Sequence, residues 1–445
     1  MFSTLLTAVP AAYTFLLLSW HLFRRHPLTK NNGFGDLSLL QHSRNPTEKI
    51  KGTAVVCGGR SVVTGLIFTL KALLDYEQHA FVDHFERILI VESEAWLASE
   101  EGRKVDGWDH KVQRTRVMQS ISLHGAFVRV PWSAYKFKLP KTMYASRAGF
   151  ETFLRCLVLD RDSYPNIEFI TGTVTDVKLD PADHSQLSAV VVRRESGVQE
   201  FAAALVADCP GPTRAGMKWL ERNGYGYSPT YPAGKLPLDQ LKISFDQKLP
   251  YAFMMFHINP AFHNRLPFPE DLKGAKPIYS FLEDGVDKGR IIVIVFVGHY
   301  GTIRSQPKNL AELKDYVRGL YTVQPIPTWV FEVIDNLEEI EDSAMVSLLK
   351  VAPTTYIRYH RATNLPSNWT ALGDSVMTPL ESDVLILTSE DCTKVFRSAL
   401  ALHKVLLGAQ AKSGNTLPFD FSTKFFREQF DKSDWSWQNT RIMGA

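Results

Sequence analysis

Cysteine is scarce in this chain. Four cysteines occur in 445 residues, and they are widely scattered: Cys57, Cys156, Cys209 and Cys392. No two of them have the spacing of a metal site or of a Cys-x-x-Cys pair, so we expect no bound metal and no structural disulfide. The sequence therefore predicts a protein that works in a reducing compartment.

Strong charge is also absent. The formal net charge at pH 7 is only +3, and no long basic run is interleaved with aromatic residues, which excludes a typical nucleic-acid-binding protein. The chain has no low-complexity tract, and its 45% hydrophobic and 22% charged residues are typical of globular proteins. A chain of this length predicts two or more packed lobes.

One long apolar run stands at the N-terminus. Residues Thr4–Phe23 carry few polar side chains, and Arg24 and Arg25 follow them. Twenty such residues suffice to cross a bilayer, and flanking arginines favour the cytosolic side. We expect residues 1–27 to be a single-pass membrane anchor, with 28–50 as a tether and a cytosolic body at the endoplasmic reticulum. A cleaved presequence and a peripheral amphipathic segment are the alternatives.

The stretch 53–92 has the pattern of a βαβ dinucleotide-binding unit. An apolar run ends in Gly58 and Gly59, a helix-like segment follows, and a second apolar run ends in Glu92. Glycines let a backbone turn approach a pyrophosphate, and an acid at the second strand end accepts from a ribose hydroxyl. The next glycine, Gly65, is seven residues beyond Gly58 where the fingerprint has five, and Glu92 is 34 residues beyond it. The alternative is an ordinary strand-turn-helix with glycine at a tight turn.

Three further positions are candidates for ligand contacts. Arg147 falls in the first turn of a predicted helix, where a cation opposes the helix dipole unless it has an anionic partner. Asp208 ends a predicted strand and leads into a turn that contains Gly211, and Asp374 follows Gly373 at the end of another. The bland alternatives are a surface arginine and aspartates that only cap their turns.

Residues 226–350 differ from the flanking segments in their pattern of predicted strands and helices. Strand-like runs and two helical runs alternate with turn residues, which predicts a mixed β-sheet substrate lobe inserted into the α/β lobe. The expected parts are thus a first α/β part at 51–225 and a return to it at 351–445. Seven aromatics are candidates for lining an apolar cavity, with core packing as the default: Tyr251, Phe253, Phe256, Tyr279, Phe281, Phe296 and Tyr300.

Three blocks in this order resemble the FAD-dependent monooxygenases of the aromatic-hydroxylase type, the p-hydroxybenzoate hydroxylase-like family, and most closely its branch in fungal secondary metabolism. They are Val55–Gly65 with Glu92, Asp208–Arg214 with the following Trp219, and Gly373-Asp374 with Pro379. The resemblance covers about residues 50–225 and 365–430. It implies a Rossmann-like FAD-binding lobe with a parallel sheet, and oxidation of an apolar secondary metabolite with O2 and NAD(P)H, NADPH being expected.

The resemblance also assigns roles to residues. It implies cofactor contacts from Gly58, Gly59, Glu92, Arg147, Asp208, Gly211 and Asp374. It implies no catalytic acid or base, because the cofactor carries the chemistry while the protein positions substrate and excludes water. The FAD motifs are degenerate: Ser382-Asp383-Val384 stands where the family has glycines. Two alternatives remain open, a non-redox cyclase, isomerase or substrate-holding protein, and an oxidoreductase that uses a nicotinamide cofactor alone.

Overall fold

The computed structural model describes most of the chain after residue 150 and the principal strands before it. The described residues are 49–58, 84–97, the short strands β3 (Arg116–Val117), β4 (Ser120–Leu123), β5 (Ala126–Arg129) and β6 (Lys141–Thr142), and 151–443 except 153–154, 157, 163, 247, 249, 268–279, 283–287, 299–304, 321–324, 351, 379–388 and 414–415. The predicted anchor and tether, and the helix between Gly58 and the strand that ends at Glu92, lie outside these residues.

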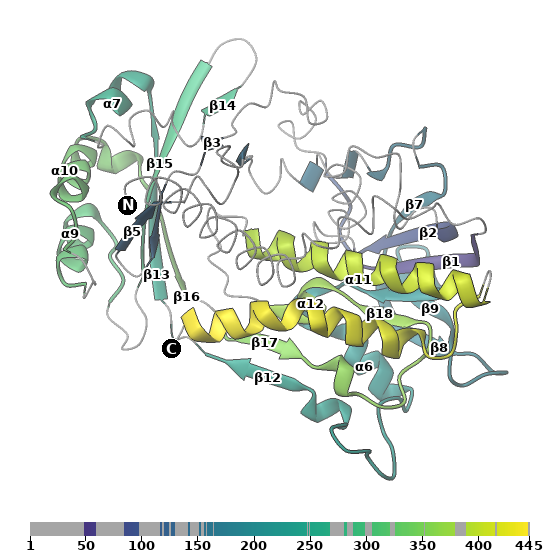
Figure 1. Ribbon diagram of the computed structural model, residues 1–445. Helices are drawn as coiled ribbons and strands as arrows, with labels where there is room; N and C mark the ends of the chain where they lie inside the picture. Colours follow the sequence, from purple (N-terminus) through teal and green to yellow (C-terminus); the bar gives the residue numbers. More distant parts are fainter. Residues whose placement is uncertain are drawn as a thin grey trace, which may run out of the picture.

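A five-stranded parallel sheet forms the first lobe, at the right of Figure 1. Its order is β18-β11-β1-β2-β7, with β1 (Ile50–Cys57), β2 (Phe85–Glu92), β7 (Ile167–Thr171), β11 (Leu205–Asp208) and β18 (Trp369–Ala371), and every neighbouring pair is parallel. Near-continuous apolar runs such as Ala54–Cys57 are buried, as expected for parallel strands covered on both faces. The predicted α/β class with a parallel sheet is confirmed.

Two long helices lie side by side along the first lobe (Figure 1). They are α11 (Ser389–Ser413) and α12 (Phe421–Met443). The Gln429 amide on α12 donates to the Ala371 carbonyl at 3.0 Å and to Ser398 Oγ of α11 at 3.3 Å, so one buried side chain joins both helices to strand β18. These bonds fix the C-terminal end of that strand.

A three-stranded antiparallel meander packs beside the parallel sheet. It consists of β8 (Thr173–Leu179), β9 (Leu187–Arg194) and β10 (Gly197–Ala202), and α6 (Ala215–Arg222) lies against β8. The sequence pattern of 167–177 and that of 200–208 each predict a single strand, but neither run forms one. Each run divides between two sheets, the first at Gly172, where an added Cβ would lie 2.6 Å from Val192.

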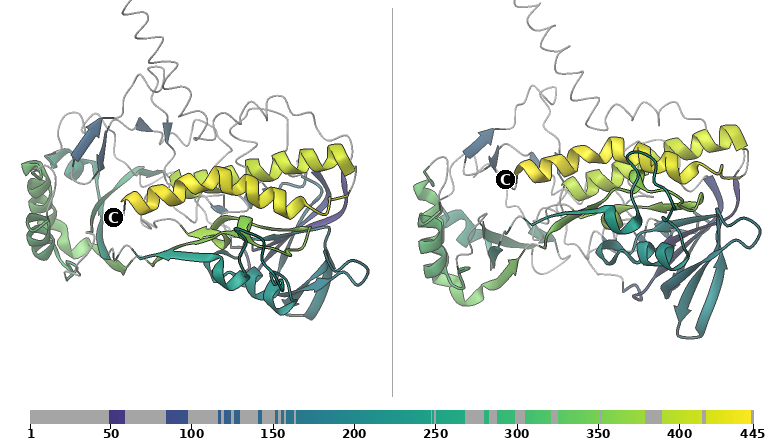
Figure 2. Two further views of the ribbon diagram at one scale, coloured as in Figure 1. Left: turned by 60° about the horizontal axis from the view of Figure 1, so that its bottom comes forward. Right: turned by 90° about the horizontal axis from the view of Figure 1, so that it is seen from below.

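The second lobe is an antiparallel sheet with helices on its outer face (Figures 1 and 2). The order is β14-β15-β13-β16, with β13 (Pro250–Ile258), β14 (Ser280–Leu282), β15 (Lys288–Gly298) and β16 (Met345–Lys350). Its core packs against α7 (Pro260–Arg265), α9 (Leu310–Arg318) and α10 (Thr328–Leu337). The sequence predicted a mixed sheet, whereas every described pairing is antiparallel. Strand β15 runs opposite to both of its neighbours, β13 and β14, and β16 runs opposite to β13, so no two strands of the same direction are adjacent.

A small sheet stands between the lobes. It comprises β12 (Lys242–Phe245), β17 (Thr354–Ile357) and β19 (Met377–Thr378), in the order β12-β17-β19. Of the candidate cavity aromatics, Phe256 and Tyr251 are buried, and Phe256 belongs to the helix-covered core. Phe253 is only partly buried. Within the described part of the chain, no helix has the length and hydropathy needed to span a bilayer.

Candidate functional site

The candidate residues converge on the carboxyl edge of the parallel sheet. Cys57, at the end of β1, is in register with Asp208 of β11 and with Val91 of β2, and Asp208 is in register with Ala371 of β18. Four adjacent strands therefore end at the same edge of the sheet. The turns that follow them begin at Gly58, Glu92, Asp208 and Gly373. Gly59 and Arg147 lie outside the described residues.

Gly58 is required by the packing of two turns. Its φ is +93°, and a Cβ there would lie 2.7 Å from the Cys209 carbonyl oxygen. Its N–H donates to the Val91 carbonyl at 2.8 Å, which continues the ladder between β1 and β2. Glycine is therefore needed at this position because a side chain would clash with the Cys209-Pro210 backbone, and this requirement does not depend on a bound ligand.

Glu92 orders the turn that follows β2. Its side chain is 4% exposed, and Oε1 accepts from the Ser93 N–H at 2.8 Å and from Ser93 Oγ at 3.0 Å. These bonds hold the carboxylate at the strand end, within its own turn. The Arg155 guanidinium lies 6.0 Å from the ring centre of Trp96, in the loop after β2, and 5.5 Å from that of Phe169 on β7. These cation–π contacts connect the loop to the neighbouring strand.

Asp208 is a fully buried carboxyl. Its exposed fraction is 0%, and neither oxygen has a hydrogen-bond partner among the described residues. Burial raises the pKa of Asp208 to about 8, and the Gly216 N–H, which faces the carboxyl from the first turn of α6, lowers it in part. The helix N-terminus thus partly offsets a cost that burial imposes on the ionised form.

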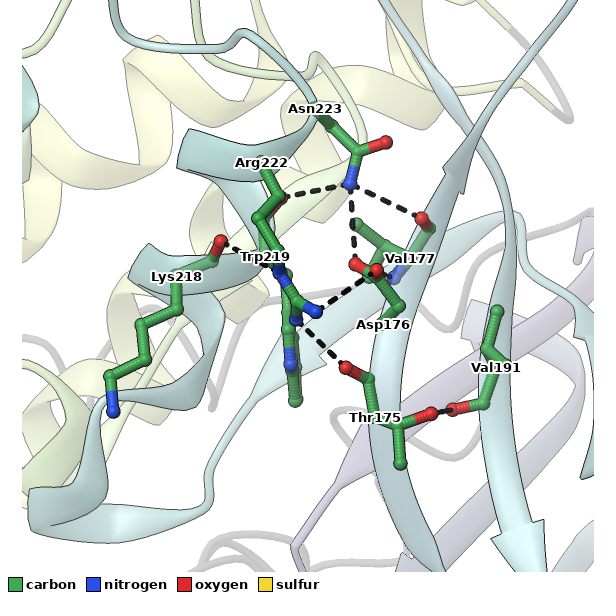
Figure 3. Close-up of polar contacts among 8 residues, drawn as sticks. All are labelled: Thr175, Asp176, Val177, Val191, Lys218, Trp219, Arg222 and Asn223. Atoms are coloured by element: carbon green, nitrogen blue, oxygen red, sulfur yellow. Dashed lines mark hydrogen bonds and ion pairs between the residues drawn. The ribbon is translucent and has the colours of Figure 1, made fainter.

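The C-terminal end of α6 is held on the meander by hydrogen bonds (Figure 3). Asn223 Nδ2 donates to the Trp219 carbonyl at 2.8 Å and to Asp176 Oδ1 at 3.3 Å. Arg222 Nη2 donates to the Thr175 carbonyl at 2.9 Å. The first bond satisfies the Trp219 carbonyl in the last helical turn, and the other two fix the helix on β8.

Two further polar side chains lie behind Asp208, and the sequence did not single them out as site residues. Arg214 has a left-handed φ of 50° at the N-cap of α6, and its guanidinium hydrogen-bonds Thr355 Oγ1 of β17. Burial first, and then Asp208, raises the pKa of the Tyr359 phenol well above its ordinary value, whereas Arg214 lowers it. Arg214 is the last residue of the block Asp208–Arg214, so the sequence could have singled it out. Tyr359 comes from a distant segment in which no sequence motif marks it as a site residue.

The turns after β11 and β18 lie side by side. They are short 3-10 turns, η5 (Gly211–Thr213) and η9 (Gly373–Ser375), and the Gly211 N–H donates to Ser375 Oγ at 3.1 Å. Gly211 has φ +77°, and the nearest atom to an added Cβ would be the Asp374 Cβ, 4.0 Å away. An added Cβ at Gly211 would therefore just reach van der Waals contact with Asp374, which is partly exposed.

This edge fits an extended dinucleotide. Glu92 is an acceptor at the β2 end, and Asp374 is a partly exposed acid beside Gly211. Such acceptors suit the hydroxyls of a ribose and of a ribityl chain, and they stand where ligands of parallel α/β sheets bind. Asp208 is different in kind, because it is enclosed by protein and faces α6.

No family model matches the chain, and no curated protein matches it. Solved structures similar to it include the anhydrotetracycline hydroxylase OxyS from Streptomyces rimosus, at 14% identity, with 89% of this chain and 69% of that chain covered and a TM-score of 0.48. The p-nitrophenol 4-monooxygenase PnpA from Pseudomonas putida DLL-E4 is similar at 15% identity, with 89% of each chain covered and a TM-score of 0.49.

A putative FAD containing monooxygenase from Photorhabdus luminescens subsp. laumondii TTO1 is similar at 12% identity, with 89% of this chain and 98% of that chain covered and a TM-score of 0.46. All three TM-scores are below 0.5. The function proposed below therefore rests on the residues of the site and on the resemblance of the sequence motifs.

Proposed function

We propose that this chain is an FAD-dependent monooxygenase that hydroxylates or epoxidises an apolar secondary metabolite with O2 and NAD(P)H. The observation that carries the proposal is the convergence of four strand-end turns on one edge, where the Gly211 turn packs beside the turn that holds the partly exposed Asp374. The same four turns carry the motifs that resemble the family. NADPH is the nicotinamide donor that we expect.

The residues of the edge have distinct tasks in this proposal. Glu92 binds the adenosine ribose, and Asp374 accepts from hydroxyls of the ribityl chain beside Gly211. Asp208 and α6 form the floor beneath the turns and exclude water from it. Bound FAD supplies the electron transfer and the oxygen activation, so the protein needs to contribute orientation and a dry pocket.

The antiparallel sheet supports an apolar substrate. Along β13, Met254 and Phe256 are buried against the helices, while Phe253 and Met255 alternate with them and are only partly buried on the opposite face. Alternate residues of a strand point to opposite faces. This second face, which carries the partly buried Phe253 and Met255, gives an aromatic and apolar surface suited to a ring system.

A membrane tether is part of the proposal. The motivation is the apolar run Thr4–Phe23 followed by Arg24 and Arg25. The full chain should sediment with membranes and resist carbonate extraction, and deletion of residues 1–27 should release a folded body into the supernatant. Release of the intact full chain by carbonate would contradict a spanning helix.

A non-redox reaction in the same pocket is the second candidate. It is favoured by Ser382-Asp383-Val384, because side chains and a carboxylate there would crowd and repel an electron-rich flavin. The test is to purify the protein with FAD, remove the excess, and measure NADPH-dependent O2 consumption with apolar polycyclic substrates. We expect a product one oxygen atom heavier than the substrate. A colourless protein that still converts a substrate without O2 uptake would replace the monooxygenase by the second candidate.

A further inference from the structure

Strand β16 is an edge strand whose apolar side chains face solvent. In the described sheet it pairs with β13 alone. Its exposed fractions are 56% at Met345, 39% at Val346, 41% at Leu348 and 37% at Leu349. Because alternate residues of a strand point to opposite faces, both faces of β16 are exposed. An apolar strand of this kind is a template for pairing with another strand.

The backbone of β16 is also available for pairing. Tyr251 of β13 is in register with Leu349, and the Gln306 amide donates to both of their carbonyls at 2.6 Å. The Leu349 carbonyl therefore points toward β13. In an antiparallel ladder this direction alternates along the strand, so the N–H and C=O groups of Val346 and Leu348 point outward. No described strand pairs with them.

The charges at the two ends of β16 are opposite. Before the strand stands the acidic turn η7 (Glu338–Ser343), and Lys350 ends the strand. Glu341 accepts from the Leu310 N–H at 2.7 Å and thus has a hydrogen-bond partner within its own lobe. Asp342 and Lys350 are exposed, and neither has a hydrogen bond or ion pair to a described residue. A strand with an acid at one end and a base at the other is complementary to itself when it is reversed.

We propose that β16 is the interface through which a second copy of this chain binds, as an antiparallel strand pair about a two-fold axis at Ser347. This pairing sets Val346 opposite Leu348 of the second copy. It covers the exposed apolar side chains and places Lys350 beside the acidic turn of the other copy, which includes Asp342. Isologous pairing of this kind closes the assembly at two copies and continues the antiparallel sheet across the dimer. The proposal is independent of the proposed function.

The acidic turn selects against other occupants. Three glutamates and Asp342 flank the strand, so an anionic membrane surface is repelled there. A second copy brings its own lysine to this turn and needs no additional partner. An intramolecular segment from outside the described residues would leave the protein monomeric, and the test below distinguishes that outcome.

Cysteine cross-linking tests the register. At the two-fold axis Ser347 faces itself in a non-hydrogen-bonded pair, whose side chains are close enough for a disulfide. The full chain carrying Ser347→Cys and Cys156→Ser, in a nonionic detergent, should form a covalent dimer under mild oxidation on a non-reducing gel. The matched control is Glu195→Cys in the same background, exposed in the turn between β9 and β10. Equal cross-linking of the two variants would overturn the proposal.

Mass measurements test the strand and its charges. Light scattering of the detergent-solubilised full chain should give twice the 50.3 kDa chain mass after detergent correction. Leu348→Lys should halve that mass with an unchanged circular dichroism spectrum, because the side chain is already exposed. Lys350→Glu should weaken the dimer several-fold, and adding Asp342→Lys should restore it. A wild-type monomer at all concentrations, or a dimer that persists in Leu348→Lys, would contradict the proposal.

Discussion

Two aspartates at the ends of adjacent parallel strands have opposite surroundings. Asp208, at the end of β11, is fully buried and has no hydrogen-bond partner among the described residues. Asp374, just beyond β18, is partly exposed beside Gly211. The sequence predicted both as cofactor contacts. The structure encloses the first beneath a helix and leaves the second partly exposed, and the cofactor contact of each stays a prediction.

The difference shows that a strand-end acid has two uses. An acid that faces a helix N-terminus is held by protein, and its protonation state belongs to the stability of the fold. A partly exposed acid beside a strand-end turn lies where ligands of parallel α/β sheets bind. The following variants separate these uses, from the largest expected effect to the smallest.

Asp208→Asn should change how stability depends on pH. Burial raises the pKa of Asp208 to about 8, above its unfolded value of 3.8. The folded state therefore keeps a proton that the unfolded state releases, and this contribution to stability is present below the unfolded pKa and lost as pH rises to about 8. The slope is about 1.4 kcal/mol per pH unit between the two pKa values.

Urea unfolding at pH 5 and at pH 8 measures this effect. We expect Asp208→Asn to gain stability relative to wild type as the pH rises. Gly408→Ala, in helix α11, is a control without a titratable group, and its difference from wild type should be the same at both pH values. A constant difference for Asp208→Asn as well would mean that Asp208 is ionised in the folded protein.

Gly216→Ala should destabilise the fold by about 1–3 kcal/mol, the usual cost of overpacking. An added Cβ would lie 2.1 Å from Asp208 Oδ2, and the carboxyl has no free space into which to move. The control is again Gly408→Ala, where an added Cβ would have no atom within 4 Å, so this helix substitution should be neutral or stabilising by up to about 1 kcal/mol. Thermal unfolding of both variants checks the pair, and equal midpoints would contradict the close packing of α6 on Asp208.

Asn223→Ala should cost about 1 kcal/mol, because it removes the side-chain donor to the Trp219 carbonyl of α6 and to the Val177 carbonyl of β8. Arg222→Ala should cost less, since its ion pair with Asp176 is exposed. Urea midpoints measure both. A larger loss in Arg222→Ala than in Asn223→Ala would show that the arginine is the principal clamp.

The strand-end residues could be predicted because their signals are local. An apolar run that stops at glycine or aspartate marks the end of a buried strand, and the parallel order of those strands then brings the ends together. Glu92, Asp208 and Asp374 lie at strand ends on this edge as that argument requires. Their ligands stay a prediction.

The surroundings of Asp208 depend on contacts between distant segments. Tyr359 is 151 residues from Asp208, and the approach of Gly216 depends on how α6 docks on β8. Strand β16 was also missed, because the short apolar run of Met345–Lys350 follows an acidic turn without a hairpin signal. The division at Gly172 is likewise decided by packing on Val192.

An equilibrium FAD titration tests the central claim most directly. Flavin fluorescence would be followed as the full-length wild type, Asp374→Ala and Gly408→Ala are added to FAD. We predict saturable binding to wild type and Gly408→Ala, and an affinity loss of about 1–3 kcal/mol in Asp374→Ala, the cost of leaving buried ribityl hydroxyls without an acceptor. No binding to wild type at saturating protein, or equal affinity for Asp374→Ala, would contradict a flavin site on this edge of the sheet.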